Sequence, residues 1–364
     1  MEHPAKASAS ALLPNNFDLL RLLAALQVLV MHSIYVFQTG QGLGTDLLAQ
    51  APGVPVFFFI SGFLISAAWE RNPNLPDFAR NRFLRLAPAY LAVTLFSLAA
   101  ILAFAHLPLA RVAPKLALWL GAQLVLLSDW NPGFLRGYGD GVVNGSLWTI
   151  PIEVCFYAAT PFLYRLIARS KNEVRLLAAL AAASFVLLYV DAILMHRLHS
   201  GKMIFKFIDL TPFPWFGMFI CGLLAQRYRD VVLPVVRDRA WLFGLLALVV
   251  MAITVEWRLP PLLTSGNRTV GIVNFATLAL FAMAFAYSGR GVAARLLHRN
   301  DISYGLYLFH LPIANALFAN GFRGVTGILL TGVLAIGAGC LSWFLIEKPI
   351  LARRGSALYR HETG

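Results

Sequence analysis

Two ionisable side chains, Arg21 and His32, interrupt the first long apolar run of the sequence. They are eleven residues apart, so on a helix they would differ by about 20° around the axis and about 16 Å along it. Titratable groups inside a membrane segment are costly and are candidates for function. One helix face would carry a cation and, deeper, an imidazole, which suits the two ends of one long ligand. A snorkelling arginine and a hydrogen-bonded core histidine are the alternative.

A basic cluster follows the second apolar run. Arg82 and Arg85 would share one face at i,i+3 spacing if this loop is helical. Guanidinium groups bind phosphate oxygens in a forked geometry. Because Arg21 is expected at the same depth, three guanidiniums could converge on a polyphosphate. Ordinary positive-inside charge or contact with anionic lipid explains the same residues without a ligand.

A single carboxylate, Glu153, stands at the start of a later apolar run. Pro151 is favoured at the first position of a helix, which would place Glu153 in the first turn. A glutamate there complements the helix dipole. As a functional group, a buried carboxylate at mid-membrane could act together with His32.

A further polar face opens the run that begins at residue 301. Ser303, Tyr307 and His310 share one side of a helix at i,i+4 and i,i+3 spacing. His310 is expected at a depth close to that of His32, as a second catalytic histidine or as a polar contact between helices. Supporting or substrate-binding positions are predicted at Ser61, Ser146, Trp148, Ser303, Tyr307 and His310.

The composition indicates that a membrane positions these residues. The chain has 364 residues, of which 59% are hydrophobic and 13% charged, whereas soluble proteins carry about 25% charged residues. Disordered, fibrous and ordinary soluble classes are therefore excluded. The net charge of +13 fits positively charged inner loops, so no nucleic-acid partner is expected. The sequence contains no metal-binding, Walker or dinucleotide motif, and neither a metal nor a tightly bound cofactor is expected.

Eleven apolar runs approach or exceed the length of a membrane span, which is about 20 residues. They are residues 17–37, 51–68, 86–106, 113–128, 146–167, 174–195, 211–226, 241–256, 269–288, 301–319 and 325–346. Segments holding 21 of the 30 Lys and Arg residues place both termini in the cytoplasm. Two inner termini need an even number of crossings, so 113–128, which is short, is interpreted as re-entrant or interfacial. We predict an all-α, polytopic integral membrane protein with about ten transmembrane helices.

The domain organisation follows from the same pattern. A membrane domain over residues 17–346 would lie between a cytoplasmic N-terminal tail, 1–16, and a cytoplasmic C-terminal tail, 347–364. No linker or soluble domain interrupts the apolar runs.

Taken in order, these motifs resemble the acyltransferase-3 family of bacterial membrane O-acyltransferases. Arg21 and His32 are similar to its basic-x10-His signature, and Arg82-Phe83-Leu84-Arg85 is similar to its Arg-x-x-Arg motif. The other matching elements are Phe58-Phe59-Ile60-Ser61-Gly62-Phe63, Ser146-Leu147-Trp148-Thr149 with Glu153, Ser303-Tyr304-Gly305 ending at His310, and Glu347-Lys348-Pro349. The resemblance covers roughly residues 15–350.

The resemblance implies an O-acyltransferase of the bacterial inner membrane, surrounded by membrane lipids. Acyl-CoA, with acetyl-CoA expected, would be the co-substrate, and a surface glycan or lipid-linked glycan the acceptor. Arg21, Arg82 and Arg85 would then hold the donor phosphates, His32 would be the base, and Glu153 would orient His32 or the acceptor. Direct transfer and an acyl-His32 intermediate both stay open, as does the oligomeric state.

Two other functions explain part of the pattern. A transporter or flippase for a lipid-linked glycan would also need many spans and mid-membrane ionisable groups. An acyltransferase acting on a small cytoplasmic metabolite would use the same donor site and would need no outward opening.

Overall fold

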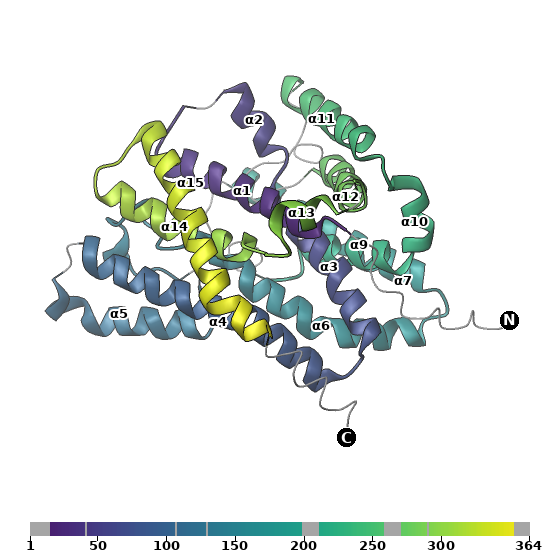
Figure 1. Ribbon diagram of the computed structural model, residues 1–364, viewed down its shortest axis with the longest axis horizontal. Coiled ribbons are helices and arrows are strands. Elements are labelled where there is room, and N and C mark those ends of the chain that lie inside the picture. The colour runs from purple at the N-terminus through teal and green to yellow at the C-terminus, as the bar shows by residue number, and fades with distance from the viewer. Residues whose placement is uncertain are drawn as a thin grey trace.

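The computed structural model describes residues 15–40, 42–105, 108–128, 130–198, 211–257, 271–289 and 291–352. These residues form helices, turns and loops, with no strand among them. The helices, labelled in Figure 1, are α1 (Phe17–Val36), α2 (Leu43–Ala49), α3 (Gly53–Arg71), α4 (Leu75–Phe104), α5 (Leu109–Leu124), α6 (Thr149–Arg169), α7 (Glu173–Leu198), α9 (Phe216–Arg227), α10 (Arg229–Val236), α11 (Ala240–Glu256), α12 (Ile272–Ala286), α13 (Val292–Leu297), α14 (Ser303–Ala319) and α15 (Gly324–Leu341). The all-α prediction is confirmed for this part of the chain.

Six helices within the described residues are long and apolar enough to cross a membrane. A seventh crossing is possible if α10 and α11, which meet at an angle of 84°, form one broken span. The apolar helices α9 and α12 are shorter, at 12 and 15 residues. The chain is therefore a multi-pass membrane protein, and the predicted count of about ten transmembrane helices is not confirmed. Most of both predicted tails lies outside the described residues.

The segment before residue 86, whose helicity the sequence left open, is helical, because α4 begins at Leu75 and continues for 30 residues. The side chain of Asn74 accepts a hydrogen bond from the Asp77 backbone N–H at 3.0 Å, which caps the helix. Arg82 and Arg85 consequently lie on a rigid helix and not on a loop. Figure 1 shows α5 lying beside the end of α4, and α5 has 16 residues. That α5 is re-entrant or interfacial stays a prediction.

Glycines allow the inner helices to touch. A Cβ atom on Gly62 of α3 would lie 1.9 Å from the Phe219 carbonyl oxygen of α9, and one on Gly222 of α9 would lie 2.0 Å from the Phe59 carbonyl oxygen. The two helices thus meet backbone to backbone, as small residues permit inside membranes. Gly62, next to the candidate residue Ser61, is therefore a packing residue.

Helices α1 and α14 run side by side in the same direction, although about 280 residues separate them in sequence. Arg21 contacts Asp301, which immediately precedes α14, and His32 contacts His310 further along both helices. The C-terminal helix α15, coloured yellow-green in Figure 1, packs against both. This parallel pair is the frame on which the candidate site is built.

Candidate active site

A cavity of about 110 Å³ lies among α1, α3, α4, α6 and α14. Its lining includes the three arginines singled out from the sequence, Arg21, Arg82 and Arg85, and the carboxylate Glu153. Apolar side chains of α3, such as Phe57 and Leu64, form another wall. The cavity therefore combines several positive charges with an apolar side, a combination suited to a ligand that has an anionic head and a slender arm.

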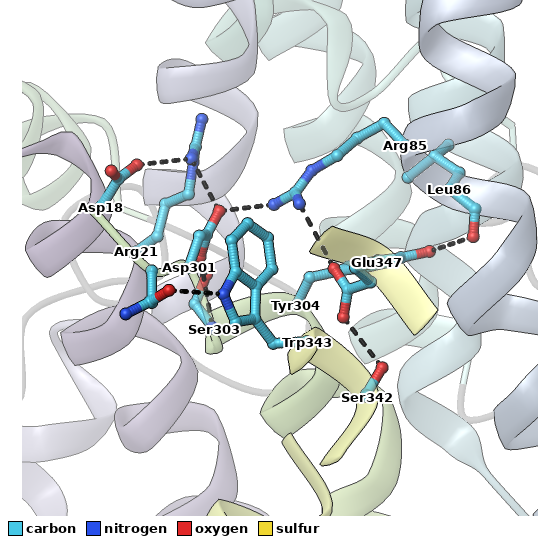
Figure 2. Close-up of polar contacts among 11 residues, drawn as sticks. Asp18, Arg21, Arg85, Leu86, Asp301, Ser303, Tyr304, Ser342, Trp343 and Glu347 are labelled. Atoms are coloured by element: carbon cyan, nitrogen blue, oxygen red, sulfur yellow. Dashed lines mark hydrogen bonds and ion pairs between the residues drawn. The ribbon is translucent and has the colours of Figure 1, made fainter. Parts of the chain in front are cut away.

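Asp301, which lies just before α14, forms ion pairs with both Arg21 and Arg85, as Figure 2 shows. Asp301 Oδ2 accepts hydrogen bonds from Arg21 Nη1 at 3.1 Å and from Arg85 Nη2 at 2.5 Å. Arg21 also donates to Asp18 at 3.1 Å. Because charge-assisted hydrogen bonds fix geometry, Asp301 holds the two guanidiniums in place before any ligand arrives.

The helical segment that follows α15 supplies a second carboxylate to Arg85. The helix winds into a π-helical turn over Ser342–Glu347, and Arg85 Nη1 donates to Glu347 Oε2 at 3.3 Å. Ser342 donates to the other Glu347 oxygen at 2.9 Å. The Arg85 guanidinium also lies over the Tyr304 ring, 5.6 Å from its centroid. Arg85 is thus held by two acids and an aromatic face.

Arg82 is bound differently from its two neighbours. Its guanidinium lies over the rings of Phe78 and Tyr157, each 5.7 Å away. Its Nε is buried and has no hydrogen-bond acceptor among the described residues. No carboxylate of the described chain forms an ion pair with it. A buried donor without an acceptor is costly, so Arg82 is the arginine best prepared to bind an incoming anion.

Glu153 lines the arginine cavity. It is the fifth residue of α6, which begins at Thr149 and not at Pro151. Its carboxylate accepts a hydrogen bond from the Tyr157 hydroxyl at 2.5 Å, one helical turn later. No hydrogen bond joins Glu153 to His32 among the described residues, and the predicted action of Glu153 with His32 stays a prediction.

The two histidines predicted at similar depth are in direct contact. His32 Nδ1 and His310 Nε2 lie 2.8 Å apart, with ring centroids separated by 5.1 Å and ring planes 12° apart. His310 is fully buried, at 0% exposure, whereas His32 is only partly buried. Of the pair, only His32 has exposed surface.

The predicted supporting residues divide between the cavity and the helix contacts around it. Ser61 and Ser303 line the cavity, and Ser303 also hydrogen-bonds Asp301. Tyr307 lines it as well, and its hydroxyl donates to the Ser146 carbonyl at 2.9 Å. The Ser146 hydroxyl donates to Asn144 at 2.6 Å. Trp148 packs against Trp215 at 5.0 Å between centroids and is part of the aromatic core.

Two carboxylates of the network, Asp301 and Glu347, were not among the predicted site residues. Both flank apolar runs, and they are only 7% and 2% exposed. Arg21 and His32 were singled out because ionisable groups at membrane depth are functional candidates. The same argument applies to Asp301 and Glu347. Neither residue's sequence neighbours identify its arginine partner, which lies more than 200 positions away.

Comparisons with known proteins agree on an acyltransferase family. The acyltransferase domain profile matches residues 15–347. The chain is 30% identical to nodulation protein 10 of Rhizobium leguminosarum bv. viciae, over 95% of each chain. It is 24% identical to the O-acetyl transferase of Shigella phage Sf6, over 94% of this chain and 98% of the relative. It is 25% identical to a peptidoglycan O-acetyltransferase of Listeria monocytogenes, over 92% of this chain and 55% of the relative. No solved structure matches the chain.

Proposed function

The chain belongs to the acyltransferase domain family, and from that premise we propose that it moves an acyl group, with acetyl expected, from cytoplasmic acyl-CoA to a glycan hydroxyl. The chain is a membrane O-acyltransferase. The proposal goes further and specifies the acyl donor, the acceptor and the side of the membrane from which the donor enters. The glycan would be a cell-surface glycan or exopolysaccharide, free or lipid-linked, since one relative is a peptidoglycan O-acetyltransferase.

The observation that carries the proposal is the convergence of three arginines on one cavity. Coenzyme A ends in phosphates, which guanidinium groups bind by charge-assisted hydrogen bonds. Arg82 offers a buried donor without an acceptor, while Arg21 and Arg85 share Asp301. Phosphate oxygens would complete the hydrogen bonding of Arg82 and compete with Asp301 for the other two.

The parallel pair α1 and α14 supports a route from the arginines to the histidines. Arg21 and His32 are eleven residues apart on α1, which corresponds to about 16 Å at helical rise. The cavity reaches Tyr307, whose carbonyl is 2.7 Å from His310 Nδ1. A pantetheine arm is slender enough to extend between helices, and its thioester would then approach His32.

The chemistry requires a base, because a hydroxyl is a poor nucleophile at neutral pH. His32 would take the acceptor's O–H proton as that oxygen attacks the thioester carbonyl carbon. The C–S bond then breaks, and the CoA thiolate recovers the proton from His32. In the covalent variant, His32 Nε2 attacks the thioester carbonyl carbon, the C–S bond breaks and the CoA thiolate leaves. The acceptor oxygen then attacks the acyl carbon, the C–N bond breaks to free His32, and the acceptor's proton passes to the thiolate. Glu153, at the cavity, would position the donor rather than act on His32.

The proposed orientation places the chain in the bacterial inner membrane with both termini in the cytoplasm. The arginine end of α1 would then face the compartment that makes acyl-CoA. Reporter fusions after residues 45 and 170 should report the periplasm and the cytoplasm, respectively. The reverse pattern would place the arginine cavity on the wrong side for the donor.

The direct test combines purified protein with labelled acetyl-CoA, together with mass analysis of surface glycans from cells with and without the gene. The proposal expects donor consumption and acetyl groups that disappear from the glycan when the gene is removed. Labelling of a small cytoplasmic metabolite would support the metabolite acyltransferase instead. Glycan crossing the membrane without donor consumption would support a transporter.

A further inference from the structure

The hydrogen bonds around His310 determine which nitrogen of each imidazole carries a proton. His310 Nδ1 lies 2.7 Å from the backbone carbonyl oxygen of Tyr307. A carbonyl oxygen only accepts, so Nδ1 of His310 must be protonated. An imidazolium would be a buried charge, and His310 has no exposed surface and no ion pair with a carboxylate of the described residues. Burial of an unpaired charge is costly, so His310 is neutral and its Nε2 is a hydrogen-bond acceptor.

The same logic then fixes the protonation of His32. Its Nδ1 lies 2.8 Å from His310 Nε2, and because that nitrogen accepts, His32 Nδ1 must donate. The centroid separation of 5.1 Å and the 12° angle between ring planes fit two rings that meet edge to edge, which aligns an N–H···N bond. A neutral His32 protonated on Nδ1 has its lone pair on Nε2.

Pro312 interrupts the backbone hydrogen bonding of α14 next to the carbonyl group that binds His310. Pro312 lacks the N–H that would bond the Leu308 carbonyl, and its ring crowds that carbonyl. Asn144 donates to the freed Leu308 oxygen at 2.9 Å. The adjacent Tyr307 carbonyl accepts from His310. The acceptor that orients His310 is therefore a backbone group in a helix fixed by tertiary contacts.

We infer that His310 is a positioning residue that holds His32 as the tautomer with an unprotonated Nε2, the nitrogen that receives the acceptor's proton or the acyl group. This inference rests on the proposed function for the identity of the reaction. His310 itself is fully buried and acts only through His32. As His32 gains positive charge, its Nδ1–H bond to His310 strengthens, which lowers the barrier to that step.

The first test reads the tautomer without reference to activity. Protein labelled with 15N at its eight histidines is studied by magnetic resonance, and the signals missing from His32→Ala identify His32. We expect a protonated Nδ1 and an unprotonated Nε2 in His32, with a scalar coupling between His32 Nδ1 and His310 Nε2. A protonated Nε2 in neutral His32, or an imidazolium, would overturn the inference even in an active enzyme.

The second test separates positioning from packing. His310→Leu removes the acceptor but fills the space, and we expect kcat to fall about 10–100-fold, as for other residues that orient a reactive group, with donor KM unchanged. His310→Gln offers an amide oxygen near the position of Nε2 and should recover most of the loss. Equal losses in two well-folded variants would contradict the tautomer role. Full activity in His32→Ala would instead remove His32 from the mechanism, whereas wild-type protein that consumes no acetyl-CoA would refute the proposed function.

Discussion

The two ends of the α1–α14 pair use opposite chemistry. At the arginine end, Arg21 and Arg85 share Asp301, and Arg85 also contacts Glu347. At the histidine end, His32 and His310 contact each other, and neither forms an ion pair among the described residues. One end is a network of charges and the other is a pair of neutral rings.

This difference shows how one helix pair can support binding and catalysis separately. Ionised carboxylates hold guanidiniums in a fixed position, which suits capture of an anion. A carboxylate beside His32 would favour the imidazolium, which cannot accept a proton. Keeping the acids at the arginine end leaves the histidine neutral and able to act as a base.

The largest effect is expected at the histidine end. His32→Ala should lower transfer about 10²–10⁴-fold, the usual contribution of a general base, while the protein still inserts and folds. Activity of purified protein with labelled acetyl-CoA measures it. His298→Asn removes an exposed histidine on α13's C-terminal side and is the matched control. Near-normal transfer in His32→Ala would remove His32 from the mechanism.

The same variant series distinguishes the two chemical routes. If an acyl-His32 intermediate forms, label from acetyl-CoA should accumulate on wild-type protein in the absence of acceptor and be absent from His32→Ala. Direct transfer leaves both proteins unlabelled.

At the arginine end, we expect a smaller but measurable difference in stability between variants of Arg85 and Arg82. Arg85→Ala leaves Asp301 and Glu347 without their shared partner and should destabilise the protein by about 3–5 kcal/mol. Arg82→Ala removes only cation–π contacts, worth about 0.5–2 kcal/mol depending on how far they are desolvated. Thermal unfolding in detergent compares them. Equal stability of the two variants would show that the carboxylate network does not hold Arg85.

The smallest effect on stability is expected for a glycine of α3, the helix that forms the apolar wall of the cavity. Gly62→Ala would force α3 from α9, where the new Cβ would meet a backbone oxygen at 1.9 Å, and should cost about 1–3 kcal/mol. Gly337→Ala on α15 meets nothing within 4 Å and should be neutral or stabilising by about 0.5–1 kcal/mol. Thermal unfolding again reports both. A harmless Gly62→Ala would mean that α3 and α9 can separate without loss.

Periodicity and charge predicted much of this architecture but not its polar partners. The i,i+3 spacing placed Arg82 and Arg85 on one helical face, and depth alone placed His32 near His310. The predicted apolar run began only at residue 86 because arginines lower the local hydropathy, whereas α4 itself begins at Leu75, after the Asn74 cap. Depth also suggested Glu153 near His32, but it carries no information about which way a side chain of α6 points.

The carboxylates Asp301 and Glu347 show the same limit. Each is a single acid at the end of an apolar run, and its arginine partner lies on another helix more than 200 residues away. Only the packing of α1, α4, α14 and the π-helical turn brings them together. Such contacts depend on tertiary structure, which local spacing does not determine.

The central claim, that the arginine end binds the donor and the histidine end performs the chemistry, is tested most directly by equilibrium binding of acetyl-CoA. His32→Ala should bind acetyl-CoA with the affinity of the wild type. Arg82→Ala should bind about ten- to a hundredfold more weakly, because one charge-assisted hydrogen bond is worth about 1.5–3 kcal/mol. Unchanged affinity in folded Arg82→Ala, or lost affinity in His32→Ala, would contradict this division of the site.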